Sequence, residues 1–171
     1  CFSLQQTAHD ITVRLESRLV LLRPPGNVPA GAPIMLASTM GATAFHEGLG
    51  GIHALDPPLG APYGAHHGLL NAILLPYVLK YNRAAVEDKM TDIAYHLRLE
   101  QPGFNSFMQW LDDFCRHLGI PQTLKDIGID PHESRLIGEQ AAQDPSASGN
   151  PVRLSETEYA SIFINAVEGH Y

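Results

Sequence analysis

The sequence predicts an all-α protein, a helical bundle of about seven helices. Three observations predict this class. Apolar residues recur at intervals of three and four along most of the 171-residue chain, which is the spacing of a helix with one buried face. Capping boxes and glycine–proline stops mark where such helices begin and end. The alternation of polar and apolar residues that is typical of strands is absent.

The first third of the chain is expected to hold two helices. One is amphipathic and covers roughly residues 4–22. The other, from about Ile34 to Ala54, is rich in Gly and Ala, whose small side chains permit close packing. Pro57 and Pro58 should end this second helix, because proline lacks a backbone N–H and clashes with the preceding turn.

The segment that follows is expected to form a loop and then an apolar helix. Gly60, Pro62 and Gly64 favour the loop. Residues 66–68 should open the helix, which runs through Pro76.

Two amphipathic stripes predict the next two helices. Gly119 and Pro121 should end the second of them, because glycine takes the left-handed terminal conformation and proline blocks continuation. Cys115 lies on the apolar face and is expected to pack as a small hydrophobic side chain. The first stripe consists of Val86, Met90, Ile93, Ala94 and Leu97, and the second of Phe104, Phe107, Met108, Leu111, Phe114, Cys115 and Leu118.

Two capping patterns predict the last helices. In residues 130–133, Asp130 should be the N-cap of a helix that begins at Pro131. Residues 155–158 form another capping box, and residues 145–151 between the two patterns are expected to be a low-complexity loop. The last helix should bury Tyr159, Ile162, Phe163 and Ala166.

The composition indicates a single soluble, acidic domain. Hydrophobic residues make up 44% of the chain and charged residues 17%, so a core can form. The longest apolar run, Gly68 to Leu79, is too short to span a membrane, and the net charge of −7 argues against a nucleic-acid partner. Cys1 and Cys115 make no disulfide framework, so a cytoplasmic location is expected. Because the chain opens with Cys1 rather than Met, we expect a fragment or a trimmed domain.

Between Pro24 and Leu79 the only charged residues are Glu47 and Asp56. Because desolvating a charge is costly, this segment should be the buried middle of a larger assembly. We therefore expect the chain to form a homo-oligomer or to associate with a missing half.

Four of the nine histidines cluster, at positions 46, 53, 66 and 67. A helix end at His53 and a helix start at His67 would bring two imidazoles together across a short loop, and neutral imidazole binds Zn²⁺ or Fe²⁺ well. Spacing alone leaves two alternatives open for each of them, a hydrogen-bonded core histidine or a side chain that serves a helix start.

The segment from Gly48 to Leu79 resembles the signature of the iron-containing (group III) alcohol dehydrogenases, a branch of the dehydroquinate-synthase-like superfamily. The runs GLGxxHA, PLGA and HHGLLNAILLPYVLKYN carry the resemblance. It continues through LGIP at residues 118–121 and DPSASGNP at residues 144–151, and it covers roughly residues 30–171.

The resemblance implies both a fold and a metal site. In that family an N-terminal α/β domain binds NAD(P), and a C-terminal helical domain holds one divalent metal through an Asp and three His. The third and fourth ligands fall on His53 and His67. The first two belong to a D-x-x-x-H motif that should lie upstream of His53, where this chain has none; Gln5 and His9 share only its spacing, which leaves His9 as a candidate ligand. Residues 1–171 are then a single helical metal-binding domain, and the nucleotide-binding domain is absent from this chain.

One departure from the family concerns the position four residues after the third ligand, where many members carry a His near the nicotinamide. Here Pro57 stands at that position and Asp56 precedes it. We expect Asp56 to be an exposed loop carboxylate in preference to a polar group of the cleft.

The resemblance implies part of an NAD(P)-dependent oxidoreductase that transfers hydride between a primary or small alcohol and the nicotinamide. A divalent metal, Fe²⁺ in the first place and Zn²⁺ as the alternative, would polarise the alcohol or carbonyl oxygen. With only two matched ligands, the chain by itself should be inactive. The alternatives are a non-catalytic helical remnant or interaction domain, and a zinc-dependent glycerol dehydrogenase or dehydroquinate synthase of the same superfamily.

Overall fold

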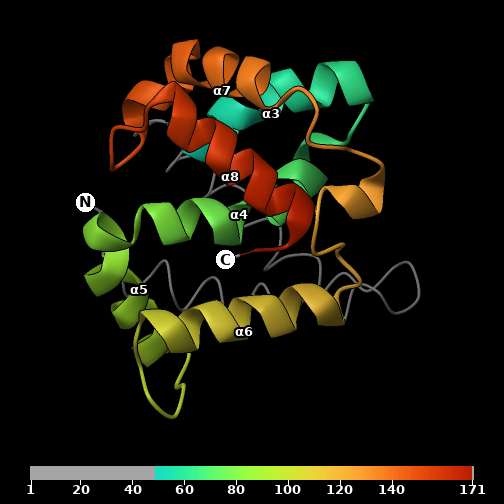
Figure 1. The fold of residues 1–171 in the computed structure, drawn as a ribbon. Helices are drawn as coiled ribbons and strands as arrows, with labels where there is room; N and C mark the ends of the chain where they lie inside the picture. Colours follow the sequence, from blue (N-terminus) through green and yellow to red (C-terminus); the bar gives the residue numbers. More distant parts are fainter. Residues whose placement is uncertain (1–48, 171) are drawn as a thin grey trace, which may run out of the picture. The chain divides into compact units, whose positions relative to one another are not determined.

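The computed structural model describes residues 49–170 of the chain (Figure 1). Over this range it contains six α-helices, two short 3₁₀ helices and no strand, so the all-α class is confirmed. The expected helix over residues 4–22, most of the one from Ile34 to Ala54, and His9 and His46 lie outside the described residues. The helices of the described part are all too short or too polar to span a bilayer.

The chain divides into two compact units. One contains, among the described residues, Asp88–Phe107, and the other consists of Leu49–Glu87 and Met108–Tyr171. The candidate site lies entirely in the second unit.

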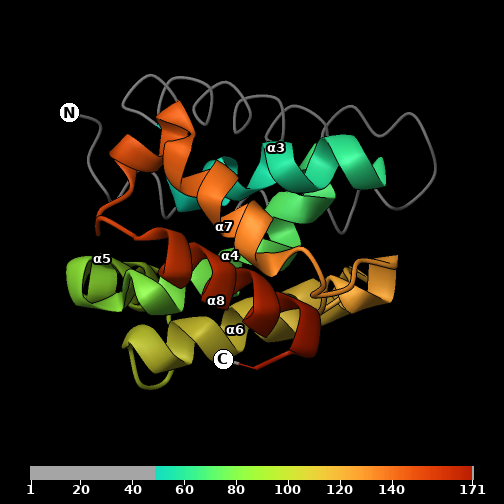
Figure 2. The same cartoon turned by 45° about the horizontal axis from the view of Figure 1, so that its top comes forward.

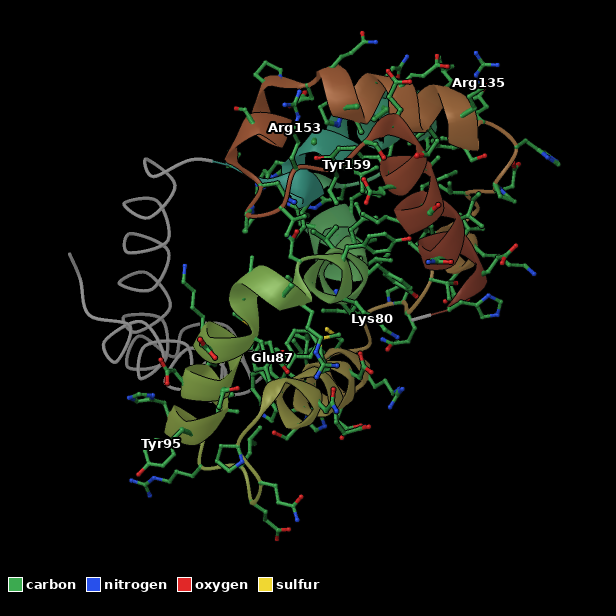
Figure 3. The ribbon with its side chains drawn as sticks, turned by 60° about the vertical axis from the view of Figure 1, so that its left-hand side comes forward. Lys80, Glu87, Tyr95, Arg135, Arg153 and Tyr159 are labelled. Carbon is green, nitrogen blue, oxygen red and sulfur yellow. The ribbon has the colours of Figure 1, made fainter. Side chains whose placement is uncertain are left out.

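Helices α5 (Arg83–His96) and α6 (Phe104–His117) cover the two predicted amphipathic stripes except for their last residues, Leu97 and Leu118, which follow the helix ends directly. As predicted, α6 ends before Gly119, which adopts the left-handed conformation with φ of 70°. Cys115 is buried on α6, as predicted, and burial raises the pKa of its thiol. Tyr95 on α5 points away from its helix into solvent and is 71% exposed (Figure 3).

Helix α3 (Gly51–Tyr63) corrects the expected boundaries of the Gly-rich helix. Gly50 is extended and caps the start of α3, so Leu49 and Gly50 are not helical, although the sequence predicted a helix there. The helix then continues through Pro57 and Pro58 instead of ending at them. The expected loop shrinks to the three residues 64–66 before α4 (His67–Tyr81), which runs through Pro76 as predicted.

Packing explains why α3 survives its three prolines. Each proline costs the helix a hydrogen bond and introduces a clash with the preceding turn. Leu55 and Leu59 are completely buried, and each contributes about 1.5–3 kcal/mol of hydrophobic stabilisation. Pro58 is buried with them, whereas Pro57 points outward. Tertiary burial thus offsets the unfavourable local preference.

Helix α7 (Ser134–Gln143) begins later than the sequence predicted. Asp130 does not cap a helix: its carboxylate accepts a hydrogen bond from the backbone N–H of His132 at 3.0 Å, which closes a turn. The helix starts after Glu133, which makes no side-chain cap. Between α7 and the last helix, the expected loop contains a 3₁₀ helix, η2 (Pro145–Gly149).

The core of the second unit is formed by four helices. The last of them, α8 (Glu156–Glu168), packs against α7 and α4, while α3 packs against α7 and α4 (Figures 1 and 2). Tyr159 of α8 lies in the interior, and Arg135 of α7 points outward (Figure 3). The other predicted residues of the α8 face are buried too: Ile162, Phe163 and Ala166.

The capping box of α8 is formed as predicted, and its loss should be measurable. The Ser155 side chain accepts from the backbone N–H of Glu158 at 3.3 Å, and the Glu158 carboxylate accepts from the Ser155 N–H at 2.7 Å. We expect Ser155→Ala to lower the free energy of unfolding by about 1 kcal/mol, measured by urea denaturation. In the control Ser161→Ala, which removes a hydroxyl in the middle of the same helix, the change should stay within about 0.5 kcal/mol. Equal losses in the two variants would show that the cap contributes no more than the hydroxyl in the middle of the helix.

Candidate metal centre

The site is built on the hairpin of α3 and α4. Gly64 ends α3 in the left-handed conformation, with φ of 61°, which glycine adopts without steric cost. His66 is the N-cap of α4, and its Nδ1 accepts a hydrogen bond from the backbone N–H of Gly68 at 3.2 Å. His66 therefore serves the start of α4.

Helical spacing places two polar side chains on the inner face of each helix of the hairpin. His53 and Asp56 are three residues apart on α3, and His67 and Asn71 are four apart on α4, so each pair shares a face. The ring centroids of His53 and His67 are 5.4 Å apart and the rings are tilted by 52°. The predicted approach of the two imidazoles is confirmed, although His53 comes from the start of α3 and not from a helix end.

Asp56 joins this pair, which corrects its expected role as an exposed loop carboxylate. It lies inside α3, and its side chain is only 19% exposed. Its Oδ2 is 2.9 Å from Nδ1 of His67. On the other side of the same ring, Nδ2 of Asn71 is 2.9 Å from Nε2. Both ring nitrogens of His67 are thus in contact with side chains of the hairpin.

The environment of His53 favours its neutral form. Partial burial lowers the pKa of the imidazole, and the neighbouring His67 lowers it further, whereas Asp56 and Asp144 act in the opposite direction. A neutral imidazole has one nitrogen lone pair that can bind a metal ion. The site therefore suits His53 as a ligand at neutral pH.

Asn150 fixes the base of the hairpin. Its Oδ1 accepts from the backbone N–H of Gly51 at 3.0 Å and from Nδ2 of Asn82 at 2.8 Å. Its Nδ2 donates to Oδ1 of Asn82 and to the carbonyl of Val152, both at 2.7 Å. Because Gly51 begins α3 and Asn82 caps the end of α4, one side chain holds both open ends of the hairpin together. A Cβ at Gly51 would come within 3.1 Å of that side chain, which explains the glycine.

The chemistry of these donors fits a divalent cation. Two imidazoles meet across the hairpin, and two buried acceptor atoms beside them, Oδ1 of Asp56 and Oδ1 of Asn71, have no hydrogen-bond partner in residues 49–170. Unpaired acceptors are costly unless a positive charge or a donor faces them. The described residues provide no group of three or more His, Cys, Asp or Glu that could hold a metal. Further ligands would have to come from elsewhere in the protein.

Four further histidines of the described part lie outside the α3–α4 hairpin. His117, His132 and His170 are exposed, and Nδ1 of His96 contacts the carbonyl of Asp92 within its own helix. The sequence did not reveal Asn71 or Asn150 as site residues. The position of Asn71 four residues after His67 could have indicated the first, but nothing local indicated the second.

The chain resembles known dehydrogenases over most of its length. Residues 11–167 match the Fe-containing alcohol dehydrogenase family, C-terminal. The chain is 33% identical over 147 residues to 1,3-propanediol dehydrogenase of Citrobacter freundii, which covers 82% of this chain and 38% of that protein. It is 32% identical over 148 residues to lactaldehyde reductase of Escherichia coli (strain K12), covering 82% and 39%. The chain thus spans less than half the length of these relatives.

Solved structures agree with this relationship. A 1,3-propanediol oxidoreductase superposes with a TM-score of 0.82 at 29% identity, over 97% of this chain and 46% of that one. An alcohol dehydrogenase from Oenococcus oeni gives a TM-score of 0.84 at 27% identity, over 93% and 43%. Together with the match over residues 11–167, these similarities show that the chain belongs to the Fe-containing alcohol dehydrogenase family and corresponds to its C-terminal part.

Proposed function

We propose that this chain is the metal-binding helical part of an NAD(P)-dependent oxidoreductase that transfers hydride between a primary or small alcohol and the nicotinamide. The observation that carries the proposal is the approach of the His53 and His67 rings across the α3–α4 hairpin, in a chain of this family. Fe²⁺ is the expected metal and Zn²⁺ the alternative, because imidazole ligands suit both ions.

The chain's own residues hold and orient the reacting groups. When bound, a divalent cation supplies Lewis acidity, which lowers the pKa of an alcohol hydroxyl or polarises an aldehyde carbonyl. His53 and His67 would hold the cation through ring nitrogens. The hydrogen bonds of Asn150 to Gly51 and Asn82 hold together the two helices that carry these histidines. NAD(P), which carries the hydride, would be bound mainly by a nucleotide-binding half outside this chain.

Substrate, partner and location follow from the relatives and the composition. 1,3-Propanediol and lactaldehyde are the first compounds to test, because relatives are named for acting on them. We propose a cytoplasmic enzyme in which this chain associates with a second copy of itself or with the missing half. Nucleic acid is not an expected partner, given the net charge of −7.

A second candidate is a non-catalytic helical remnant or interaction domain. It is favoured by the described site having only two imidazoles, and by Pro57 standing at the position where the resemblance implies a histidine. Under this alternative, the core and the hydrogen bonds of Asn150 would serve only the stability of the fold.

The test measures metal binding and oxidation separately. We expect the 171-residue chain to bind Zn²⁺ or Co²⁺ by equilibrium dialysis, and His53→Ala to reduce that binding. The chain alone should oxidise no alcohol with NAD⁺ or NADP⁺. In a combined protein, which joins this chain to a nucleotide-binding half of the same family, alcohol oxidation should appear. The oxidation should cease after treatment with a chelator and return when Fe²⁺ is added.

Absence of metal binding in the wild-type chain and in the combined protein would favour the non-catalytic alternative. Oxidation that survives complete removal of metal would contradict the assigned role of His53 and His67.

A further inference from the structure

Asp56 contacts the imidazole ring of His67 directly. It faces the first residue of α4 from the middle of α3, with Oδ2 at 2.9 Å from Nδ1 of the ring. The carboxylate is largely buried, at 19% exposed, whereas the imidazole is 57% exposed. Of the two side chains, the carboxylate of Asp56 on α3 is therefore the one more firmly held by packing.

The two contacts of His67 select one tautomer. A carboxylate oxygen can only accept, so Nδ1 carries the hydrogen and donates it to Asp56. An amide nitrogen can only donate, so Nε2 accepts from Asn71 and carries the lone pair. Asp56 and Asn71 thus act on opposite sides of the ring and favour the same tautomer.

A histidine that binds a metal commonly donates its other ring N–H to a carboxylate, which fixes the ring's orientation and makes the binding nitrogen more basic. We propose that Asp56 is a positioning residue: it holds Nδ1–H of His67 so that Nε2 is the atom presented to the metal, which would replace the Asn71 amide at the single lone pair of Nε2. The inference rests on the proposed metal-binding function. It assigns to Asp56 an action through His67 and no direct bond to the ion.

The first test reads the tautomer directly in the metal-free chain. Long-range ¹H–¹⁵N spectra should show the hydrogen of neutral His67 on Nδ1 in the wild type. Asp56→Ala should lose this preference. Asp56→Asn should keep it, because the amide oxygen that replaces the carboxylate can still accept the Nδ1 hydrogen.

The second test measures Zn²⁺ affinity by competition with a chelating dye. Asp56→Ala should weaken binding about 10- to 100-fold, the usual effect of losing a partner of a metal ligand. Asp56→Asn should recover most of that loss. The matched control is Glu168→Ala, which removes a comparable contact with Nδ1 of His170, at 3.2 Å, and should leave Zn²⁺ affinity unchanged.

The outcomes separate this inference from the proposed function. A hydrogen on Nε2 of His67 in the wild type would overturn the role of Asp56 and leave the metal site standing. A loss in Asp56→Asn as large as that in Asp56→Ala would also overturn it, because a charge-dependent or direct bond to the metal would then be at work. Failure of the wild-type chain and the combined protein to bind Zn²⁺ or Co²⁺ would instead overturn the proposed function, while the tautomer spectra would still decide what Asp56 does to the ring.

Discussion

His67→Ala is expected to abolish metal binding and alcohol oxidation while leaving the helical fold intact. The substitution removes one of the two imidazoles, and we expect metal affinity to fall at least about 100-fold, since loss of a mere partner of a ligand already costs up to that much. The ring is 57% exposed and starts a helix, so the free energy of unfolding should fall by only about 1 kcal/mol or less. Dialysis against Zn²⁺, circular dichroism and the oxidation assay of the combined protein would be applied to the same variant.

The adjacent histidine provides a control with the opposite profile. His66→Ala removes the N-cap contact with the backbone N–H of Gly68, so it should lower the free energy of unfolding by about 0.5–1 kcal/mol. It should leave metal affinity nearly unchanged. Retained metal and activity in His67→Ala, or loss of metal in His66→Ala, would mean that the wrong imidazole has been assigned.

Gly138→Val is expected to cause the largest loss of stability of any single substitution considered for this chain. A Cβ at this position of α7 would overlap the carbonyl oxygen of Glu156 and lie 2.9 Å from Cβ of Ala160, both on α8. Overpacking at such a contact typically costs 1–3 kcal/mol, and valine adds two further methyl groups, so we expect a loss of about 3 kcal/mol or more. That is a large part of the 5–15 kcal/mol that is usual for a domain. Urea denaturation followed by circular dichroism would measure it.

Gly60→Ala is the matched control, because Gly60 also lies inside a helix. A Cβ there would find Cδ1 of Leu70 at 3.7 Å, which is an ordinary contact. Alanine should therefore stabilise the chain by about 0.4–1 kcal/mol, because it reduces the conformational entropy of the unfolded state. A Gly138→Val variant as stable as the wild type would show that α7 and α8 do not approach as closely as the structure places them.

The sequence predicted those helices whose signals are local. The capping box at Ser155 and the stripe ended by Gly119 involve residues within a few turns of one another, and both were confirmed. The prediction failed where packing overrides local preference. Pro57 and Pro58 were expected to end a helix, yet α3 continues through them because Leu55 and Leu59 are buried. Asp130 was expected to be an N-cap, but its carboxylate accepts a hydrogen bond within a turn, four residues before α7 begins.

The candidate site was only partly predictable for a similar reason. The approach of His53 and His67 followed from their spacing around a tight connection and from the resemblance. The contact of Asp56 depends on α3 continuing past its prolines, so the error in the helix boundary carried over into the prediction for this side chain. The role of Asn150 depends on a contact with Gly51 that is 99 residues distant, and no local pattern reveals such a pair.

The paired amides of Asn82 and Asn150 have a consequence for how this sequence can change over time. Each amide donates to the oxygen of the other, at 2.8 and 2.7 Å, so the two side chains form a reciprocal pair. An aspartate at either position would set a carboxylate oxygen against an amide oxygen, and two acceptors repel. An aspartate at one position therefore requires a compensating replacement at the other. Among descendants of a common ancestor, these two positions should covary although 68 residues separate them.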